Sequence, residues 1–243
     1  MYYTINGDFM KETIYTIPVN EAFDKKCGCP LCSMADILEE NEIERITGAA
    51  MMEPDVRIET NKKGFCHRHF DMMYKKNAVL PLGLILESHI DEIINGLNEK
   101  KIGLFSKKKE VNKIEIDYLN FQNNSCYVCD RVEDFFKEEI DTIFLLYKKS
   151  PEFRDKVKAQ PYFCLPHLEL LLRQAPKRLS QNSLVEFSET IINITKEYLK
   201  VMKEDVSWFC KKFDYRYQNE DWKNSKDSIP RAIKLLTSKT SEK

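Results

Sequence analysis

Six cysteines and two histidines in this 243-residue chain form a pattern that occurs twice. Each copy has a C-x2-C motif followed, more than thirty residues later, by a C-x2-H motif. Three thiols and one imidazole are the ligand set of a tetrahedral structural zinc site. The sequence therefore predicts two zinc ions per chain, with the ligands Cys29, Cys32, Cys66, His69, Cys126, Cys129, Cys164 and His167.

The spacing within the two copies indicates an internal duplication. Pro54 and Pro151 each lie 22 residues after the second cysteine of their C-x2-C motif, and an arginine follows each proline by three residues. The distances to the C-x2-H motifs differ by one residue. Matched spacing of this kind favours one structural unit used twice.

Other uses of these thiols rank below zinc. An iron–sulfur cluster with three cysteines and a histidine is the next alternative, followed by paired redox thiols. Neither copy contains C-x2-C-H, so the sequence does not support covalent haem. A site closed by three thiolates and one imidazole leaves no position for water, so the expected role of the metal is structural.

The gap between the half-motifs raises a geometric question. A helix of about 20 residues rises roughly 30 Å. The dozen residues after Pro54 can span that distance only if they are largely extended, or if the helix bends. We expect each site to close within its own copy; the alternative pairs the C-x2-C of one copy with the C-x2-H of the other.

The remaining cysteines and histidines are weaker candidates. His67 lies between two ligands, but its counterpart in the second copy is Leu165, so we interpret it as a residue at the edge of the site. His89 is expected at the edge of the core. Cys27 could replace Cys29 as a ligand, whereas Cys210 is expected to be a small buried hydrophobic residue.

The elements that must position these ligands are helices. Only seven glycines occur, and few segments alternate between apolar and polar residues, so the predicted fold is all-α with two tandem helical repeats, each organised around one metal site. Helices are predicted from Pro30 to about Met52, from the Gly64–Cys66 stretch onward, and along the apolar stripe from Leu184 to Phe209.

The predicted organisation has five parts. The N-terminal part holds an extended segment that ends at Pro18 and a short helix over Glu21–Phe23. Two repeats flank a lysine-rich linker, and an aromatic and polar tail packs on the repeats. The boundaries are 1–28 for the N-terminal part, 29–99 for the first repeat, 100–113 for the linker, 114–210 for the second repeat and 211–243 for the tail.

Composition limits the partners and the compartment. The net charge is −1, so no global attraction to nucleic acid or an anionic membrane is encoded, and we expect neither as a partner. The N-terminus has no signal-peptide pattern and no run approaches the length of a membrane span, which indicates a cytoplasmic protein. In a reducing compartment, eight cysteines favour metal binding over disulfides.

The tail is the part where a recognition surface is most plausible. Both tryptophans of the chain lie in it or beside it. The alternative interpretation is that its aromatic residues fold back and seal the second repeat. The candidate surface comprises Asp214, Arg216, Trp222, Asn224, Ser225, Asp227 and Arg231.

Several stretches together resemble an uncharacterised family of bacterial proteins. The resemblance spans most of the chain and implies a duplicated metal-binding helical fold in a bacterial cytoplasm, without an activity. The second copy departs from the pattern because it begins Cys126-Tyr127 rather than Cys-Pro. The stretches that carry the resemblance are Ile17–Phe23, Cys29-Pro30-Leu31-Cys32, Gly64-Phe65-Cys66 with His69, Phe163-Cys164 with His167, and Asn224–Arg231.

These observations favour a protein without enzymatic activity. Our first hypothesis is a cytosolic binding or adaptor module whose metal sites are structural, with an unknown protein or small-molecule partner. The alternative is a switch in which oxidation of the thiols releases zinc. A second alternative is an enzyme that uses the polar residues of the tail.

Overall fold

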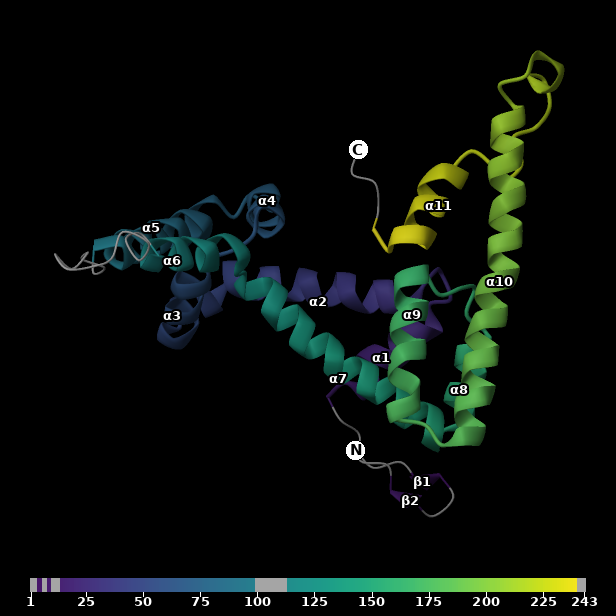
Figure 1. Ribbon diagram of the computed structural model, residues 1–243, viewed down its shortest axis with the longest axis horizontal. Helices are drawn as coiled ribbons and strands as arrows, with labels where there is room; N and C mark the ends of the chain where they lie inside the picture. The colour runs from purple at the N-terminus through teal and green to yellow at the C-terminus, as the bar shows by residue number, and fades with distance from the viewer. Residues whose placement is uncertain (1–3, 6–7, 10–13, 99–112, 240–243) are drawn as a thin grey trace. The chain divides into compact units, whose positions relative to one another are not determined.

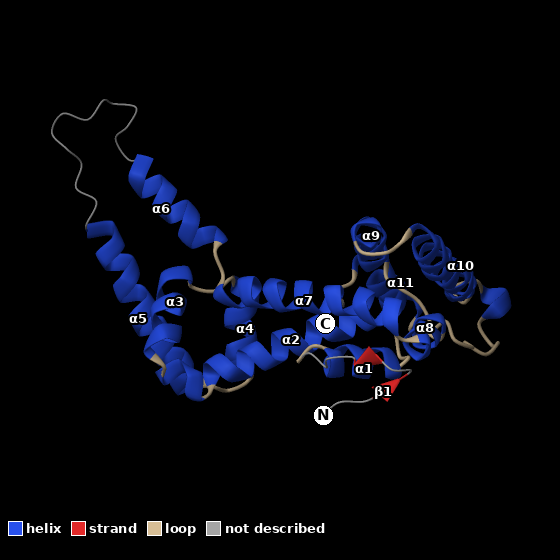
Figure 2. Cartoon of the chain, turned by 90° about the horizontal axis from the view of Figure 1, so that it is seen from below, coloured by secondary structure: helices blue, strands red, loops and turns tan. Residues whose placement is uncertain are grey.

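The structure, a computed structural model, describes residues 4–5, 8–9, 14–98 and 113–239. These residues are mostly helical (Figures 1 and 2), which confirms the predicted all-α class. The two strands, β1 (Thr4–Ile5) and β2 (Asp8–Phe9), are two residues each and pair in an antiparallel manner. Within the described ranges, no helix is long and apolar enough to cross a membrane.

The helices follow the same order twice along the chain. A long helix, a short helix that begins at a proline, a short helix that begins just after a cysteine, and a second long helix occur in each half. The first set is α2 (Pro30–Thr47), α3 (Pro54–Lys63), α4 (His67–Lys75) and α5 (Val79–Asn98). The second set is α7 (Tyr127–Lys149), α8 (Pro151–Lys158), α9 (Leu165–Gln174) and α10 (Gln181–Lys211).

The remaining helices flank these two sets. α1 (Thr16–Asp24) precedes the first set and α6 (Lys113–Asn124) precedes the second. α11 (Ser228–Thr237) begins after Asp227 and is the last helix of the described residues. Three short 3₁₀ helices are η1 (Ala49–Met52), η2 (Ala175–Lys177) and η3 (Tyr215–Tyr217).

The segment before Pro18 and the predicted linker are two places where the structure departs from the prediction or does not cover it. The prediction of an extended segment up to Pro18 is wrong for its last three residues. Thr16 to Pro18 form the first turn of α1, where a proline costs no helical hydrogen bond. Nearly all of the predicted linker, residues 100–112, lies outside the described residues. Its last residue, Lys113, is the first residue of α6.

The chain divides into two compact units that do not follow the two sequence copies. Unit 1 comprises residues 1–36 and 136–243, and unit 2 comprises residues 37–135. The helix α2 begins in unit 1 and ends in unit 2, whereas α7 begins in unit 2 and ends in unit 1. Each unit therefore contains one C-x2-C motif and one C-x2-H motif that come from different copies.

Unit 1 has a large aromatic core. Within it α10 packs against α8, α9 and α11 (Figure 1), and the predicted apolar stripe of α10 is partly buried there, at Phe187, Ile191 and Met202. The Tyr147 and Phe187 rings meet edge to face with centroids 4.8 Å apart, a geometry that aromatic pairs favour. The core cluster contains twenty-four buried residues, among them Cys29, Cys32 and Cys164.

Unit 2 has a smaller core. Its cluster contains nine buried residues, including Ile43 and Ile46 from α2 and Tyr127 and Val128 from α7. The main helix contacts in this unit join α3 to α5 and α4 to α5. The helix α6 has no buried side chain, although it approaches α5 closely at Gly96, where a Cβ atom would collide with the Tyr118 ring. Fewer buried apolar side chains therefore stabilise unit 2 than unit 1.

One buried carboxyl group makes stability depend on pH. Glu139 is 2% exposed, its Oε2 atom has no hydrogen-bond partner in the described part of the chain, and burial raises its pKa to about 7. The folded state therefore holds this proton up to a higher pH than the unfolded state, so the free energy of unfolding falls as the pH rises from about 4.5 to 7.

We expect Glu139→Gln to remove this fall in the free energy of unfolding with rising pH. At about 1.4 kcal/mol per pKa unit, the variant should be roughly 3–3.5 kcal/mol more stable than the wild type at pH 8 and similar to it at pH 4.5. Urea unfolding at both pH values measures the difference. Glu138→Gln, at an exposed neighbouring position, is the matched control. Equal pH dependence of Glu139→Gln and wild type would contradict the assignment.

Candidate metal centres

The first cluster, site 1, lies within unit 1 and combines Cys29, Cys32, Cys164 and His167. Its ligand atoms all lie within 4.8 Å of one another. The Nδ1 atom of His167 is 3.1 Å from Cys164 Sγ, 3.4 Å from Cys32 Sγ and 3.5 Å from Cys29 Sγ. The three thiols are 0–3% exposed.

The second cluster, site 2, lies within unit 2 and combines Cys66, His69, Cys126 and Cys129. The Nδ1 atom of His69 is 3.1 Å from Cys126 Sγ, 3.2 Å from Cys66 Sγ and 3.6 Å from Cys129 Sγ. Here Cys126 is buried, Cys66 is half-buried and Cys129 is exposed. The two sites thus share a ligand set but differ in exposure.

Both clusters fit a tetrahedral metal ion. Metal–sulfur bonds of about 2.3 Å and metal–nitrogen bonds of about 2.0–2.1 Å place the ligand atoms about 3.5–3.8 Å apart in a tetrahedron. The sulfur–sulfur distances are 3.6 Å between Cys32 and Cys164 and 3.9 Å between Cys66 and Cys129, far longer than a disulfide bond. Each cluster could therefore hold one metal ion with little rearrangement.

The expectation that each site closes within its own copy is wrong. Site 1 joins the C-x2-C of the first copy to the C-x2-H of the second, and site 2 joins the other two half-motifs. The physical reason is the continuous helix that follows each C-x2-C motif. The 18 residues of α2 rise about 27 Å, so the next half-motif starts far from Cys29 and Cys32.

Hydrogen bonds to two backbone carbonyl groups hold the two half-motifs of site 2 together. The N–H of Tyr127 donates to the carbonyl oxygen of Gly64 at 3.0 Å, and the Ser125 hydroxyl donates to the Lys63 carbonyl at 2.6 Å. Gly64 has φ +60°, and a Cβ atom there would lie 2.5 Å from His89 Nε2. Only glycine suits this turn, which delivers Cys66 to the start of α4.

In site 1, neighbouring helices fix the segment that carries Cys164. The N–H of Phe163 donates to the Thr195 hydroxyl on α10, and this hydroxyl is 3.3 Å from the Phe163 carbonyl. The Gln160 side chain donates to the Phe23 carbonyl at the end of α1. Cys164 then caps α9, whose third residue is His167. The helix start sets the spacing of the C-x2-H motif.

In each cluster the surroundings favour the thiolate, the form of cysteine that binds metals, at one thiol, whereas contacts with neighbouring thiols and burial raise the pKa of Cys32, Cys129 and Cys164. Burial raises the pKa of Cys126, but its contact with His69 and hydrogen bonds from the backbone at Cys129 and Cys66 together outweigh burial and lower the pKa to about 6. Burial lowers the pKa of His69, but its contacts with Cys126 and Glu39 raise it to about 10. In site 1, hydrogen bonds from neighbouring thiols and His167 hold the pKa of Cys29 below its ordinary value despite burial.

The two histidines differ in what holds their outer ring nitrogen. His69 Nε2 is 2.8 Å from the Glu39 carboxylate, which also pairs with Arg68. Glu39 lies seven residues after the second cysteine of its C-x2-C motif, and Phe136 holds the same position in the second copy. The Phe136 ring lies 5.7 Å from the His167 ring. A carboxylate orients one histidine and an aromatic ring contacts the other.

Sequence reasoning missed Glu39, and its role is testable. We expect Glu39→Gln to weaken metal binding at site 2 by about tenfold and to leave site 1 unchanged, because outer partners orient metal-binding histidines. Competitive zinc titration against a chelator measures both sites. Glu44→Gln, on the same helix as Glu39, removes a surface carboxylate that pairs with Lys76 and is the control. Equal affinities in Glu39→Gln and wild type would contradict this role.

The weaker candidates from the sequence stay outside both clusters. His67 is exposed, and His89 is buried with its Nδ1 atom 2.7 Å from the Asn61 carbonyl oxygen. Cys27 is exposed and does not replace Cys29 as a ligand. The expectation that Cys210 is buried is wrong, because its side chain lies on the exposed face of α10.

The polar residues proposed for the tail engage one another and α10. Asp214 pairs with Arg216, and Arg231 pairs with Asp205 on α10 and with Asp227. The buried Ser225 hydroxyl donates to the Trp222 carbonyl, and the Asn224 carbonyl accepts from Arg231. The Trp222 ring lies beside Phe209.

A buried lysine that sequence reasoning missed organises this tail. Lys212 Nζ donates to the carbonyl oxygens of Tyr217, Gln218 and Glu220 and lies 5.2 Å from the Trp222 ring centroid. Carbonyl oxygens of the tail thus accept three hydrogen bonds from the Lys212 ammonium group. The tail folds against α10 through these contacts.

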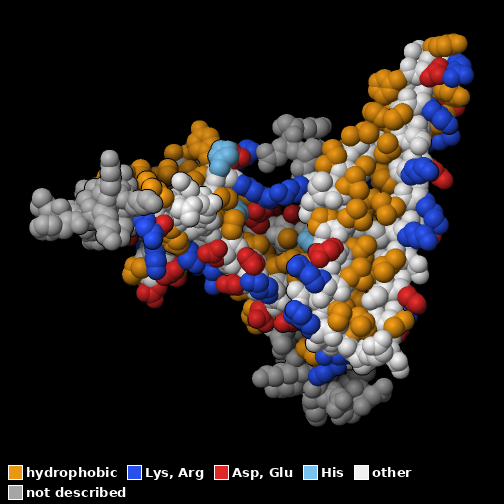
Figure 3. All heavy atoms as spheres, viewed as in Figure 1, with side chains coloured by type: hydrophobic (Ala, Val, Ile, Leu, Met, Phe, Trp, Pro, Cys, Tyr) orange, Lys and Arg blue, Asp and Glu red, His pale blue; other side chains and the backbone are white. Residues whose placement is uncertain are grey.

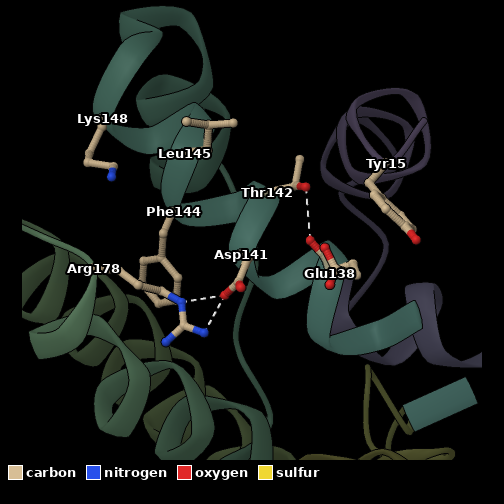
Figure 4. A pocket seen from close by; sticks show the side chains of 8 residues that line it. All are labelled: Tyr15, Glu138, Asp141, Thr142, Phe144, Leu145, Lys148 and Arg178. Carbon is tan, nitrogen blue, oxygen red and sulfur yellow. Dashed lines mark hydrogen bonds and ion pairs between the residues drawn. The ribbon is translucent and has the colours of Figure 1, made fainter. Parts of the chain in front are cut away.

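Two shallow pockets in unit 1 contain no arrangement suited to catalysis. One, of about 420 Å³, is lined by Arg178, Asp141 and six other residues (Figure 4), and Asp141 neutralises the Arg178 guanidinium. The other, of about 410 Å³, lies on α10 beside Trp208 and three lysines, where basic side chains line the edge of the helix in Figure 3.

Comparison with known proteins identifies the family without adding an activity. No curated protein and no solved structure is significantly similar to the chain. One family model, described as a family of unknown function (DUF6062), matches residues 10–243. The match covers both Cys/His clusters and the tail. The chain therefore belongs to the family of unknown function DUF6062.

Proposed function

We propose that the protein is a zinc-binding helical module in which one zinc ion closes each unit. The observation that carries this proposal is the pair of Cys3His clusters with near-tetrahedral spacing. Zinc accepts this mixed thiolate and imidazole set, and four protein ligands leave no position for a reacting water. The metal therefore stabilises the fold, and the eight free thiols suit a reducing compartment such as the cytoplasm.

Elemental analysis tests the metal assignment. Protein purified without chelators should contain about two zinc ions per chain and no iron, and it should lack absorption bands in the visible range. Visible absorption with bound iron would assign iron–sulfur clusters instead. A chain that binds neither metal would contradict the proposal.

A binding role is supported by apolar side chains that unit 2 leaves exposed. Ile90, Ile94 and Leu97 follow one face of α5 and are 41–51% exposed. On α6, Ile114 and Ile116 are about 60% exposed, and no side chain of this helix is buried. Exposed apolar faces of this kind are typical of sites that bind another protein. We assign α5 and α6 as the binding surface.

The charges beside these faces support a partner of basic character. The helices α5 and α6 carry five acidic residues against the single basic residue Lys113. An apolar stripe with acidic flanks complements a basic amphipathic helix, which places its apolar side in a hydrophobic groove. The proposed partner is a protein segment of this type. The acidic residues are Glu87, Asp91, Glu92, Glu115 and Asp117.

A model peptide tests the proposed surface. An amphipathic helix of leucine and lysine should bind the full chain, and Ile94→Asp should weaken binding about tenfold by placing a charge on the apolar face. Val201→Asp, at a similarly exposed position on α10, should bind like the wild type. Fluorescence anisotropy gives the affinities. Equal weakening by both variants, or self-association of the chain through α5 and α6, would contradict the proposal.

A thiol switch is the second candidate function, favoured by the exposure of Cys129 in site 2. Oxidation of the exposed thiolate by a peroxide would form a sulfenic acid, and a neighbouring thiol would convert it to a disulfide with loss of water. One peroxide per chain should then release zinc, and a thiol reductant should restore binding. Zinc retention at one peroxide per chain would exclude the switch.

An enzymatic role receives less support. The tail residues that could have formed an active site are engaged in contacts with the backbone and with one another. Arg231, the cation among them with the most partners, is held by two carboxylates. These contacts favour a structural role for the tail.

A further inference from the structure

The two clusters allow a comparison within one molecule. They have the same four ligand types and similar spacing, yet their surroundings differ. In site 1 all three thiols belong to the core cluster of unit 1. In site 2 only Cys126 belongs to the core cluster of its unit, and Cys129 is exposed.

Several groups cover site 1. The carbonyl oxygen of Ser238, just after α11, lies 3.9 Å from Cys32 Sγ. Tyr162, two residues before Cys164, is 7% exposed and stacks on Tyr198 of α10 with ring centroids 4.2 Å apart. These groups lie over the thiols of site 1, and His167 is the one ligand of this site that is partly exposed.

Site 2 has a fixed side and an open side. On the fixed side, His69 is held by Glu39, and Cys126 is packed in the core. The open side is formed by Cys66 and Cys129, whose sulfur atoms are 3.9 Å apart. Because Cys129 is the most exposed ligand, a molecule from solvent can approach the metal there without opening the core.

We propose that site 2 is the exchangeable site of the two and that Cys129 is the first ligand to be replaced, by a small soluble thiol or chelator. This inference rests on the proposed zinc binding. A thiolate of the incoming molecule bonds to the metal while the metal–sulfur bond of Cys129 breaks. The released thiolate then takes a proton from solvent, and no electrons are transferred. Site 1 keeps its metal over the same period.

The kinetics of zinc release test the proposal on the full chain. The two exposed cysteines outside the clusters are removed by Cys27→Ser and Cys210→Ser. With an excess of the chromogenic chelator 4-(2-pyridylazo)resorcinol, zinc should leave in two phases of one equivalent each, with rates that differ by about tenfold or more. The variant Cys129→Ser should lose the fast phase and keep the slow one.

Thiol alkylation gives a second measurement that does not depend on a site variant. Iodoacetamide at limiting concentration, followed by peptide mass spectrometry, should label Cys129 before any thiol of site 1. Two bound zinc ions released in one phase, or labelling of Cys32 or Cys164 as fast as Cys129, would overturn this inference alone. A zinc content near zero would contradict the proposed function as well.

Discussion

Replacing Cys126 by serine is expected to reduce the zinc content from two ions per chain to one and to unfold unit 2. The thiol is buried, belongs to the core cluster of this unit and contacts His69 at 3.1 Å. Loss of one thiolate from a Cys3His site removes a ligand that bonds the metal directly. We therefore expect metal binding at site 2 and folding of unit 2 to be coupled.

Losing the metal should destabilise unit 2 more than the same loss destabilises unit 1. A metal that binds only the folded state contributes about 4 kcal/mol when free zinc is a thousandfold above its dissociation constant. The core cluster of unit 2 has nine buried residues against twenty-four in unit 1. Since small cores leave little stability to spare, the same loss consumes more of the total in unit 2.

Hydrogen exchange with mass spectrometry measures this effect region by region. In Cys126→Ser, peptides from residues 37–98 should lose protection, while those from α8, α9 and α10 should keep most of theirs. Cys210→Ser replaces an exposed thiol outside both clusters and should match the wild type. Unchanged protection across unit 2 in Cys126→Ser would show that the site does not support the fold.

The ligands themselves could be predicted from the sequence because their signal is local. A C-x2-C or C-x2-H motif at a helix start places two donors on one side of a single turn. Recurrence with matched spacing then separated eight candidates from His67, Cys27 and Cys210. The helical class followed equally directly from the apolar periodicity and the scarcity of glycine.

The pairing of the half-motifs could not be predicted in this way. It depends on whether α2 and α7 continue without a bend, and the apolar residues from Met34 to Ala50 drift in phase, a pattern that predicts either a bend or a helix buried on more than one side. In the structure, α2 is continuous over 18 residues and connects the two units, so its buried positions face different neighbours along its length. The drift therefore reflects burial on several sides.

The outer groups of the sites were also beyond the reach of the sequence. Glu39 is on the helix that begins at site 1, yet it holds His69 of site 2. Ser238 lies more than two hundred residues from Cys32, the thiol that it covers. Such contacts follow from the tertiary fold and leave no pattern of spacing that a single sequence reveals.

The exchange of half-motifs between the copies has a second large consequence, which paired cysteine variants reveal. Two substitutions in one site should abolish one metal, whereas one substitution in each site should abolish both. Cys32 and Cys164 belong to site 1, and Cys66 belongs to site 2. Each variant pair therefore distinguishes closure across the copies from closure within them.

The zinc content of the two double variants, measured by mass spectrometry after dialysis in buffered zinc, tests the central claim most directly. Cys27→Ser with Cys210→Ser is the control and should keep two ions. Closure across the copies predicts about one ion in Cys32→Ser with Cys164→Ser, and none in Cys32→Ser with Cys66→Ser. The reverse result, with one ion kept by Cys32→Ser with Cys66→Ser, would contradict the account.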